Sequence, residues 1–285
     1  MERQEGFVSV DGHRMRYVRA GVGPPLLLLH GLLGYSFSWR LNEASLARHS
    51  TFYAVDLLGV GGSDRPRGLD NGLHAQARRM LRVMEELGLE SADVLGTSHG
   101  GALALMMAAL AVREGRPRVK SLILAAPANR WSKHGRIFSR VLGNPPLRWM
   151  LPAPMRWLTP LFGGLFVARQ YGDRKRISPG TVEGYSRPML APGGFEYGLD
   201  ILRTLRRDLQ ETAGLLPHIA HLPVLLVWGM RDHIVLPESL APLRACFRQA
   251  ELVLIEGAGH VPYEEFPEEF NRAVGTFLAG TSRVG

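Results

Sequence analysis

The segment Gly96-Thr97-Ser98-His99-Gly100 places a serine in the pattern Gly-x-Ser-x-Gly. An apolar run precedes this segment and an Ala-, Leu- and Met-rich run follows it, which predicts a sharp turn from a strand into a helix. On such a turn the serine hydroxyl is exposed, the backbone is strained, and the neighbouring residues must be small. Ser98 is therefore a candidate nucleophile at a helix N-terminus, where negative charge is favoured.

A serine hydroxyl needs a histidine as base, and the histidine needs a carboxylate that fixes its tautomer. Asp232 follows the apolar run 223–228, and His260 follows the run 251–255. Reactive groups in open α/β sheets gather beyond the carboxyl ends of the strands. The order Ser98, Asp232, His260, each at the end of an expected strand, therefore predicts a triad for acyl transfer.

The elements that would position these residues alternate along the chain. A hairpin is expected from runs 7–10 and 15–18 around Asp11-Gly12. Strands are expected at 25–30, 51–56, 92–96, 119–125, 223–228 and 251–255, and the first two are continuous runs typical of a strand buried on both faces. Helices are expected at 73–87, 99–113, 237–247 and 264–278. This alternation predicts the α/β class, with a mostly parallel eight-stranded sheet flanked by helices.

The alternation stops at Pro127, and residues 129–210 are rich in Arg, Pro, Gly and aromatic residues without a clear buried strand. We expect this segment to form a helical cap inserted into a core made of 1–128 and 211–285. The cap contains 14 Lys and Arg against 5 Asp and Glu, whereas the remaining residues contain 20 against 21. The net charge of +8 therefore arises in the cap segment.

The stretch 147–167 is apolar and aromatic with interspersed arginines, and it supports two interpretations. In the first, cap helices pack on the core and cover the pocket. In the second, the arginines and tryptophans form a lid that makes weak contact with anionic lipid or an aggregated ester. A basic cap could also attract acidic substrates.

Three further motifs make the chain resemble the α/β-hydrolase superfamily. They are the segments 30–34 (His-Gly-Leu-Leu-Gly), 56–66 (Asp-Leu-Leu-Gly-Val-Gly-Gly-Ser-Asp-Arg-Pro) and 257–262 (Gly-Ala-Gly-His-Val-Pro). The resemblance implies an oxyanion hole made by the backbone N–H groups of Leu32 and His99. In that superfamily the acid can also follow the sixth strand; Pro127-Ala128-Asn129 contains no carboxylate, which favours Asp232.

The resemblance further implies that substrate contacts come from residues near the nucleophile and its loops. The expected contacts are His30, Leu33, Trp131 and Val261. His30 is expected to brace the oxyanion loop rather than take part in the chemistry.

Dehalogenases and epoxide hydrolases of this superfamily carry aspartate where this chain has Ser98. The prediction is therefore a serine hydrolase of the carboxylesterase or lipase type, acting on a small-molecule ester with an apolar acyl group. Lactonases and perhydrolases with the same triad stay open as alternatives. Carbon–carbon bond hydrolases also stay open, although they tend to carry a bulky aromatic residue where this chain has Val261. A ligand-binding receptor of the same fold is the alternative that is not an enzyme.

Composition narrows the class of protein. The chain has 285 residues, of which 46% are hydrophobic and 21% charged, as is usual for a globular protein. The N-terminus lacks the pattern of a secretory signal, and Cys246 is the single cysteine, so a cytoplasmic enzyme is expected. No cofactor is expected. His218 and His221 lack further ligands, so no metal is expected, and the dispersed arginines argue against nucleic-acid binding.

Overall fold

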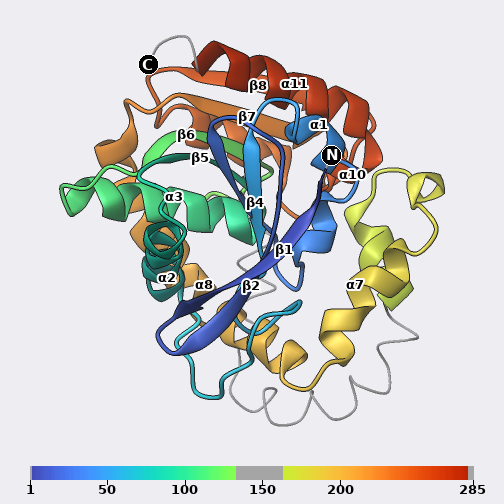
Figure 1. Cartoon of the computed structure of the whole chain (residues 1–285). Coiled ribbons are helices and arrows are strands. Elements are labelled where there is room, and N and C mark those ends of the chain that lie inside the picture. The colour runs from blue at the N-terminus through green and yellow to red at the C-terminus, as the bar shows by residue number, and fades with distance from the viewer. Residues whose placement is uncertain (1, 133–162, 282–285) are drawn as a thin grey trace.

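The computed structural model describes residues 2–132 and 163–281 (Figure 1). Its centre is one eight-stranded sheet with the order β1-β2-β4-β3-β5-β6-β7-β8. Strand β2 is antiparallel to both of its neighbours, and the remaining pairs are parallel. The strands are β1 (Gln4–Val10), β2 (His13–Ala20), β3 (Pro25–Leu29), β4 (Thr51–Val55), β5 (Ala92–Thr97), β6 (Val119–Ala125), β7 (Val224–Gly229) and β8 (Ala250–Ile255). The predicted mostly parallel sheet is confirmed.

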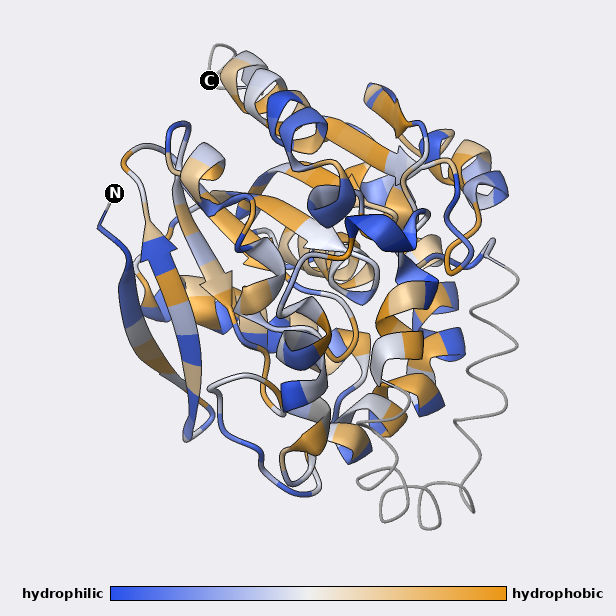
Figure 2. Ribbon diagram, turned by 90° about the vertical axis from the view of Figure 1, so that its right-hand side faces the viewer, coloured by the Kyte–Doolittle hydropathy of each residue, from blue (hydrophilic) through white to orange (hydrophobic). Residues whose placement is uncertain are grey.

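Helices cover both faces of this sheet, which explains why its central strands are continuous apolar runs. Every residue of β4, β5 and β7 is buried. One face packs against α2 (Leu73–Glu86) and α3 (His99–Arg113), and α8 (Gly194–Leu215) packs on these two helices. The other packs against α1 (Glu43–Leu46) and α11 (Pro267–Thr281). Figure 2 shows the apolar strands inside this sandwich of helices.

The first two strands form the predicted hairpin. Asp11 and Gly12 have φ values of 55° and 78°, as a two-residue turn between right-twisted strands requires. The second strand of the hairpin, β2, lies beside β4, where Tyr17 pairs with Val55.

Two predicted helices are each divided into two elements in the structure. The stretch 237–247 divides into a 3-10 turn, Pro237–Ser239, and α9, Leu240–Arg244. The stretch 264–278 divides into α10 (Pro262–Glu265) and α11 at Phe266, whose φ of −134° and ψ of 61° are not helical. Pro267 explains this break, because a proline disfavours the helical conformation of the residue before it.

The described part of the cap segment consists of helical residues 163–170, α7 (Thr181–Leu190) and α8. Helix α8 continues to Leu215 and thus passes through residue 210, where the sequence suggests the end of the cap. Residues 147–162, part of the basic aromatic stretch, lie outside the described residues. Within the described ranges, no helix is both long and apolar enough to cross a membrane. The remaining short elements are η1 (Ser36–Trp39), η2 (Arg174–Arg176) and η3 (Leu216–Ile219).

Candidate active site

Ser98 lies between the last residue of β5 and the first residue of α3, with φ 51° and ψ −117°. This conformation is strained for a residue with a side chain. The glycines on either side allow it: a Cβ on Gly96 would lie 2.4 Å from the carbonyl oxygen of Gly100. A Cβ on Gly100 would lie 2.2 Å from the carbonyl oxygen of Leu29. The predicted strand–turn–helix around Ser98 is therefore present, and its glycines are required by backbone contacts.

The loop after β3 packs against this turn. A Cβ on Gly31 would lie 3.4 Å from the Cβ of Ser98, and Leu33 has a positive φ of 59°. Gly34 N–H donates to the carbonyl oxygen of Gly31 at 3.0 Å, which closes the turn. Among the described residues, the backbone N–H groups of Leu32 and His99 have no hydrogen-bond partner. They are thus available to bind an oxygen atom beside Ser98.

His30 braces this loop in one defined tautomer. Its Nδ1 lies 2.8 Å from the carbonyl oxygen of Gly31, which can only accept, so Nδ1 carries the proton. Its Nε2 accepts the N–H of Leu57 at 3.1 Å and is therefore unprotonated. Burial lowers the pKa of His30, in agreement with a neutral ring. The side chain thus connects the loops that follow β3 and β4.

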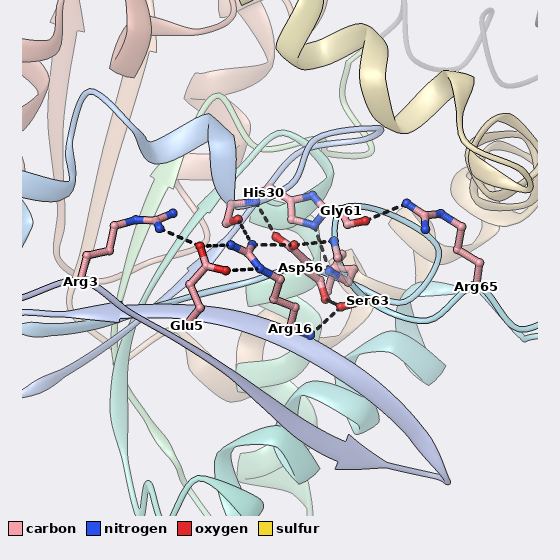
Figure 3. A network of polar contacts seen from close by, with 11 residues as sticks. Arg3, Glu5, Arg16, His30, Asp56, Gly61, Ser63 and Arg65 are labelled. Atoms are coloured by element: carbon pink, nitrogen blue, oxygen red, sulfur yellow. Dashed lines mark hydrogen bonds and ion pairs between the residues drawn. The ribbon is translucent and has the colours of Figure 1, made fainter.

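The loop after β4 is held by the buried carboxylate of Asp56 (Figure 3). Asp56 Oδ1 accepts the N–H of Ser36 at 2.7 Å, and Oδ2 accepts the N–H of Gly62 at 2.9 Å. The guanidinium of Arg16 lies 3.1 Å from Oδ2, and it also pairs with Glu5 on the edge strand β1. Asp56 therefore has a structural role, because it holds together the loops that follow β3 and β4.

Asp232 and His260 come together at the ends of β7 and β8. His260 Nδ1 lies 2.8 Å from Asp232 Oδ2, and the Asp232 side chain is fully buried. Asp232 Oδ1 accepts the N–H groups of Ile234 at 2.7 Å and Val235 at 3.0 Å. Both carboxylate oxygens are thus engaged, and the imidazole is oriented through Nδ1. Ser98 is part-buried at the same edge of the sheet, and no direct hydrogen bond joins it to His260.

The His260 loop is joined to the cap segment by the carboxylate of Glu265, which the sequence analysis did not identify. Glu265 accepts the N–H of Gly259 at 2.5 Å and the N–H groups of Gly172 and Asp173 at 2.9 and 3.0 Å. His260 N–H donates to the carbonyl oxygen of Gln170 at 2.6 Å. Burial raises the pKa of Glu265, although these three backbone donors oppose the shift.

Glycines let the two backbones meet there. A Cβ on Gly172 would lie 2.3 Å from the carbonyl oxygen of Gly257, and a Cβ on Gly259 would lie 2.5 Å from that of Gln170. On the other side of the loop, a Cβ on Gly229 would lie 2.0 Å from the carbonyl oxygen of Gly259. The end of β7, the His260 loop and the cap segment therefore pack backbone against backbone.

Glu264 makes a second connection to the cap and was also missed. Its buried carboxylate accepts from Arg40 at 2.8 Å and from the hydroxyl of Tyr171 at 2.6 Å. The hydroxyl of Tyr185 on α7 donates to its other oxygen. Burial and the charge of Glu264 raise the pKa of Tyr171 and of Tyr185. Burial opposes the charge on Arg40, but the hydrogen bond and charge of Glu264 raise its pKa overall.

His99 is buried directly after Ser98, with 3% of the residue exposed. Its Nδ1 and Nε2 atoms have no hydrogen-bond partner among the described residues. Burial, with a smaller contribution from the neighbouring His30, lowers the pKa of His99 to about 3. The ring is therefore neutral near pH 7.

The other predicted substrate contacts are placed as follows. Leu33 is buried against α8, where a Cβ on Gly198 would lie 2.8 Å from Leu33 Cδ2. Val261 is buried and Trp131 is partly buried beside the core. Asn129 accepts the N–H of Trp131 at 3.0 Å and donates to Ser239, so it supports the chain after β6 rather than supplying an acid.

A cavity of about 550 Å³ adjoins the cap segment next to the Asp232 loop. Its lining within the described ranges is Leu165, Ala168, Arg169, Tyr171, Gly172, Arg174 and His233. Among residues 2–132 and 163–281, no group of three or more His, Cys, Asp and Glu residues is placed to hold a metal ion.

Comparison with known proteins identifies relatives with several activities. The family model of the alpha/beta hydrolase fold matches residues 24–267. Haloalkane dehalogenase 2 of Mycobacterium bovis is 29% identical over 279 residues, covering 92% of this chain and 90% of that protein. A pimeloyl-acyl-carrier-protein methyl ester esterase of Nitrosospira multiformis is 30% identical over 262 residues, covering 88% and 92%.

The crystal structure of haloalkane dehalogenase DbeA from Bradyrhizobium elkani has a TM-score of 0.82 to this chain at 22% identity, covering 100% of both chains. This likeness concerns the fold. Together with the match over residues 24–267, it shows that the chain belongs to the alpha/beta hydrolase fold family and is a hydrolase by family.

Proposed function

We propose that this protein hydrolyses carboxylic esters through an acyl-enzyme formed on Ser98, with His260 as base and Asp232 as its orienting acid. The observation that carries the proposal is the 2.8 Å contact between His260 Nδ1 and a fully buried Asp232 carboxylate. Because Nδ1 donates to Asp232, Nε2 is left unprotonated and can accept the proton of a serine hydroxyl.

In the first half of the reaction, His260 takes the Ser98 proton while Oγ attacks the ester carbonyl carbon. The N–H groups of Leu32 and His99 stabilise the oxyanion, and loss of one such donor typically costs about 3–4 kcal/mol. The C–O bond to the alcohol then breaks, and His260 gives its proton to the leaving oxygen. A water molecule, deprotonated by His260, attacks the acyl-enzyme and releases the acid and Ser98.

The serine favours the esterase relative over the dehalogenase relative on chemical grounds. A carboxylate that displaces a halide forms an ester, which activated water cleaves. Ser98 would instead form an alkyl ether, which a histidine-activated water does not hydrolyse. Ester hydrolysis therefore suits Ser98, and halide displacement would stop after one turnover.

The proposed domain division is a core of 1–128 and 211–285 with a cap of 129–210 that covers the acyl site. In support, described cap residues reach both sides of the site: Gly198 packs on Leu33, and Gln170 bonds to His260. The expected substrate is a small-molecule ester with a largely apolar acyl chain.

The test is the initial rate on p-nitrophenyl esters with acyl chains from C2 to C16. We expect turnover with a maximum at one chain length and none in Ser98→Ala, whose circular dichroism should match that of the unsubstituted protein. No turnover at any chain length by folded protein would contradict the proposal. A fully active Ser98→Ala variant would contradict it equally.

A further inference from the structure

The side chain of His99 has no role in the proposed reaction, which uses only its backbone N–H. Yet the ring is buried, with 3% of the residue exposed, and both ring nitrogens lack a partner among the described residues. A buried polar group without a hydrogen bond lowers stability, so a native protein rarely keeps one without a reason. Within residues 2–132 and 163–281 nothing satisfies the ring, so it offers an unused donor and an unused acceptor next to Ser98.

The nearest histidine cannot supply it. His30 lies close enough to contribute to the low pKa of His99, but both of its ring nitrogens are engaged, with Gly31 and Leu57. Because the pKa of His99 is about 3, its ring is neutral and offers one N–H donor and one acceptor nitrogen. Such a ring can donate to one oxygen atom and accept from one hydroxyl, but it carries no positive charge that would favour a carboxylate over a neutral oxygen-bearing group.

The strand order shows which part of an ester would meet this ring. Strand β5, which leads to Ser98, has β3 on one side and β6, β7 and β8 on the other. His30 follows β3 and His260 follows β8. A Cβ on Gly100 would lie 2.2 Å from the carbonyl oxygen of Leu29 and 2.4 Å from that of His30, so the first turn of α3, which begins at His99, lies against the end of β3. The leaving alcohol must face His260 to receive a proton, so the acyl group is the part beside His99.

We infer that His99 is a specificity-determining residue that binds a hydroxyl or oxo oxygen on the acyl chain of the substrate. The backbone N–H of the same residue faces the scissile carbonyl oxygen in the proposed mechanism. The bound oxygen must therefore lie within a few bonds of that carbonyl, as in a 3-hydroxyacyl ester. The inference deepens the proposed ester hydrolysis, on which its reaction depends, and narrows the substrate class to hydroxyacyl or oxoacyl esters.

The first test compares kcat/KM for p-nitrophenyl 3-hydroxybutyrate, both enantiomers, with kcat/KM for p-nitrophenyl butyrate. A site built to bind a hydroxyl discriminates against the analogue that lacks it. We expect a preference of about tenfold or more for one hydroxy enantiomer, a ratio near 1 in His99→Leu, and a largely retained preference in His99→Gln. His221→Leu, at an exposed position in the connector before β7, is the matched control and should keep the full preference.

The second test measures binding without turnover. In the Ser98→Ala background, calorimetric titration with methyl 3-hydroxybutyrate and methyl butyrate should show tighter binding of the hydroxy ester, and Ser98→Ala/His99→Leu should not. A ratio near 1 in the unsubstituted protein, or equal binding of the two esters to Ser98→Ala, overturns the inference, whatever happens to the folding of His99→Leu. Absence of turnover together with a retained binding preference overturns the proposed function and leaves the His99 site in place.

Discussion

Asp232 uses one carboxylate oxygen for His260 Nδ1, at 2.8 Å, and the other for the backbone N–H groups of Ile234 and Val235. This division separates the positioning of the loop from the orientation of the imidazole. It also allows one role to be removed while the other is kept.

We therefore predict that Asp232→Asn folds normally and lowers kcat by a factor on the order of 10⁴. The amide oxygen can still accept from Ile234 and Val235, whereas the amide NH₂ facing Nδ1 forces the proton onto Nε2, which then cannot accept from Ser98. The measurement is kcat on the best p-nitrophenyl ester together with a thermal unfolding curve. Retention of kcat within tenfold would rule out the role given to Asp232.

Gly100→Ala should impair both stability and turnover. The added Cβ would lie 2.2 Å from the carbonyl oxygen of Leu29 and 2.4 Å from that of His30, so the loop after β3 must move away from Ser98. We expect a loss of about 3 kcal/mol in the free energy of unfolding, in the range of overpacked sites.

Gly214→Ala is the control for that substitution, because Gly214 is also in a helix and a Cβ there meets nothing within 4 Å. It should stabilise the protein by up to ~1 kcal/mol. Equal effects of the two alanines in urea denaturation would show that the close contact at Gly100 has no energetic weight.

Glu264→Gln should destabilise the connection between cap and core. The neutral amide leaves the largely buried guanidinium of Arg40 without its counter-charge, and breaking a buried pair in this way typically costs about 3–5 kcal/mol. Arg40→Met/Glu264→Gln should recover part of the loss, because the unpaired cation is removed. Urea denaturation of the single and double variants checks this, and strict additivity of the two losses would contradict it.

The stability of the protein should fall with acidification in part because of His99. Its folded pKa is about 3, below the value near 6.5 expected in an unfolded chain. Between these values the unfolded state binds a proton that the folded state does not. The free energy of unfolding therefore decreases as the pH falls, by up to ~1.4 kcal/mol per pH unit from this group.

The comparison that isolates this contribution is His99→Gln, which has nothing to titrate at position 99. Its free energy of unfolding should depend less on pH between 6.5 and 3 than that of the unsubstituted protein. Parallel curves for the two proteins would show that His99 does not carry the depressed pKa.

The strands and the positions of Ser98, Asp232 and His260 could be predicted because their signals are local. Strands buried on both faces become continuous apolar runs, and the turns that follow them carry glycine beside the polar residue. The break at Phe266 was missed although it too has a local signal, the proline that follows.

Glu264 and Glu265 could not be predicted, because their partners are distant in the chain. Arg40 is 224 residues from Glu264, and Gly172 is 93 residues from Glu265. In the sequence the two acids look like the first turn of an ordinary helix. The sequence also does not indicate that the His99 ring lacks hydrogen-bond partners among the described residues. That depends on the hydrogen bonds by which His30 is already engaged with Gly31 and Leu57.

The backbone packing of Gly172, Gly259 and Gly229 has a consequence for exchanging caps between members of the family. A cap segment from another member that includes positions 170–173 fits only if it also has glycine where the backbone of Gly172 meets the His260 loop. A chimera whose foreign segment ends before Gln170 keeps the backbone contacts between residues 170–173 and the His260 loop. A chimera whose foreign segment extends beyond Asp173 replaces the cap residues that make these contacts. The orientation of the His260 side chain would then change even though no catalytic residue had been exchanged.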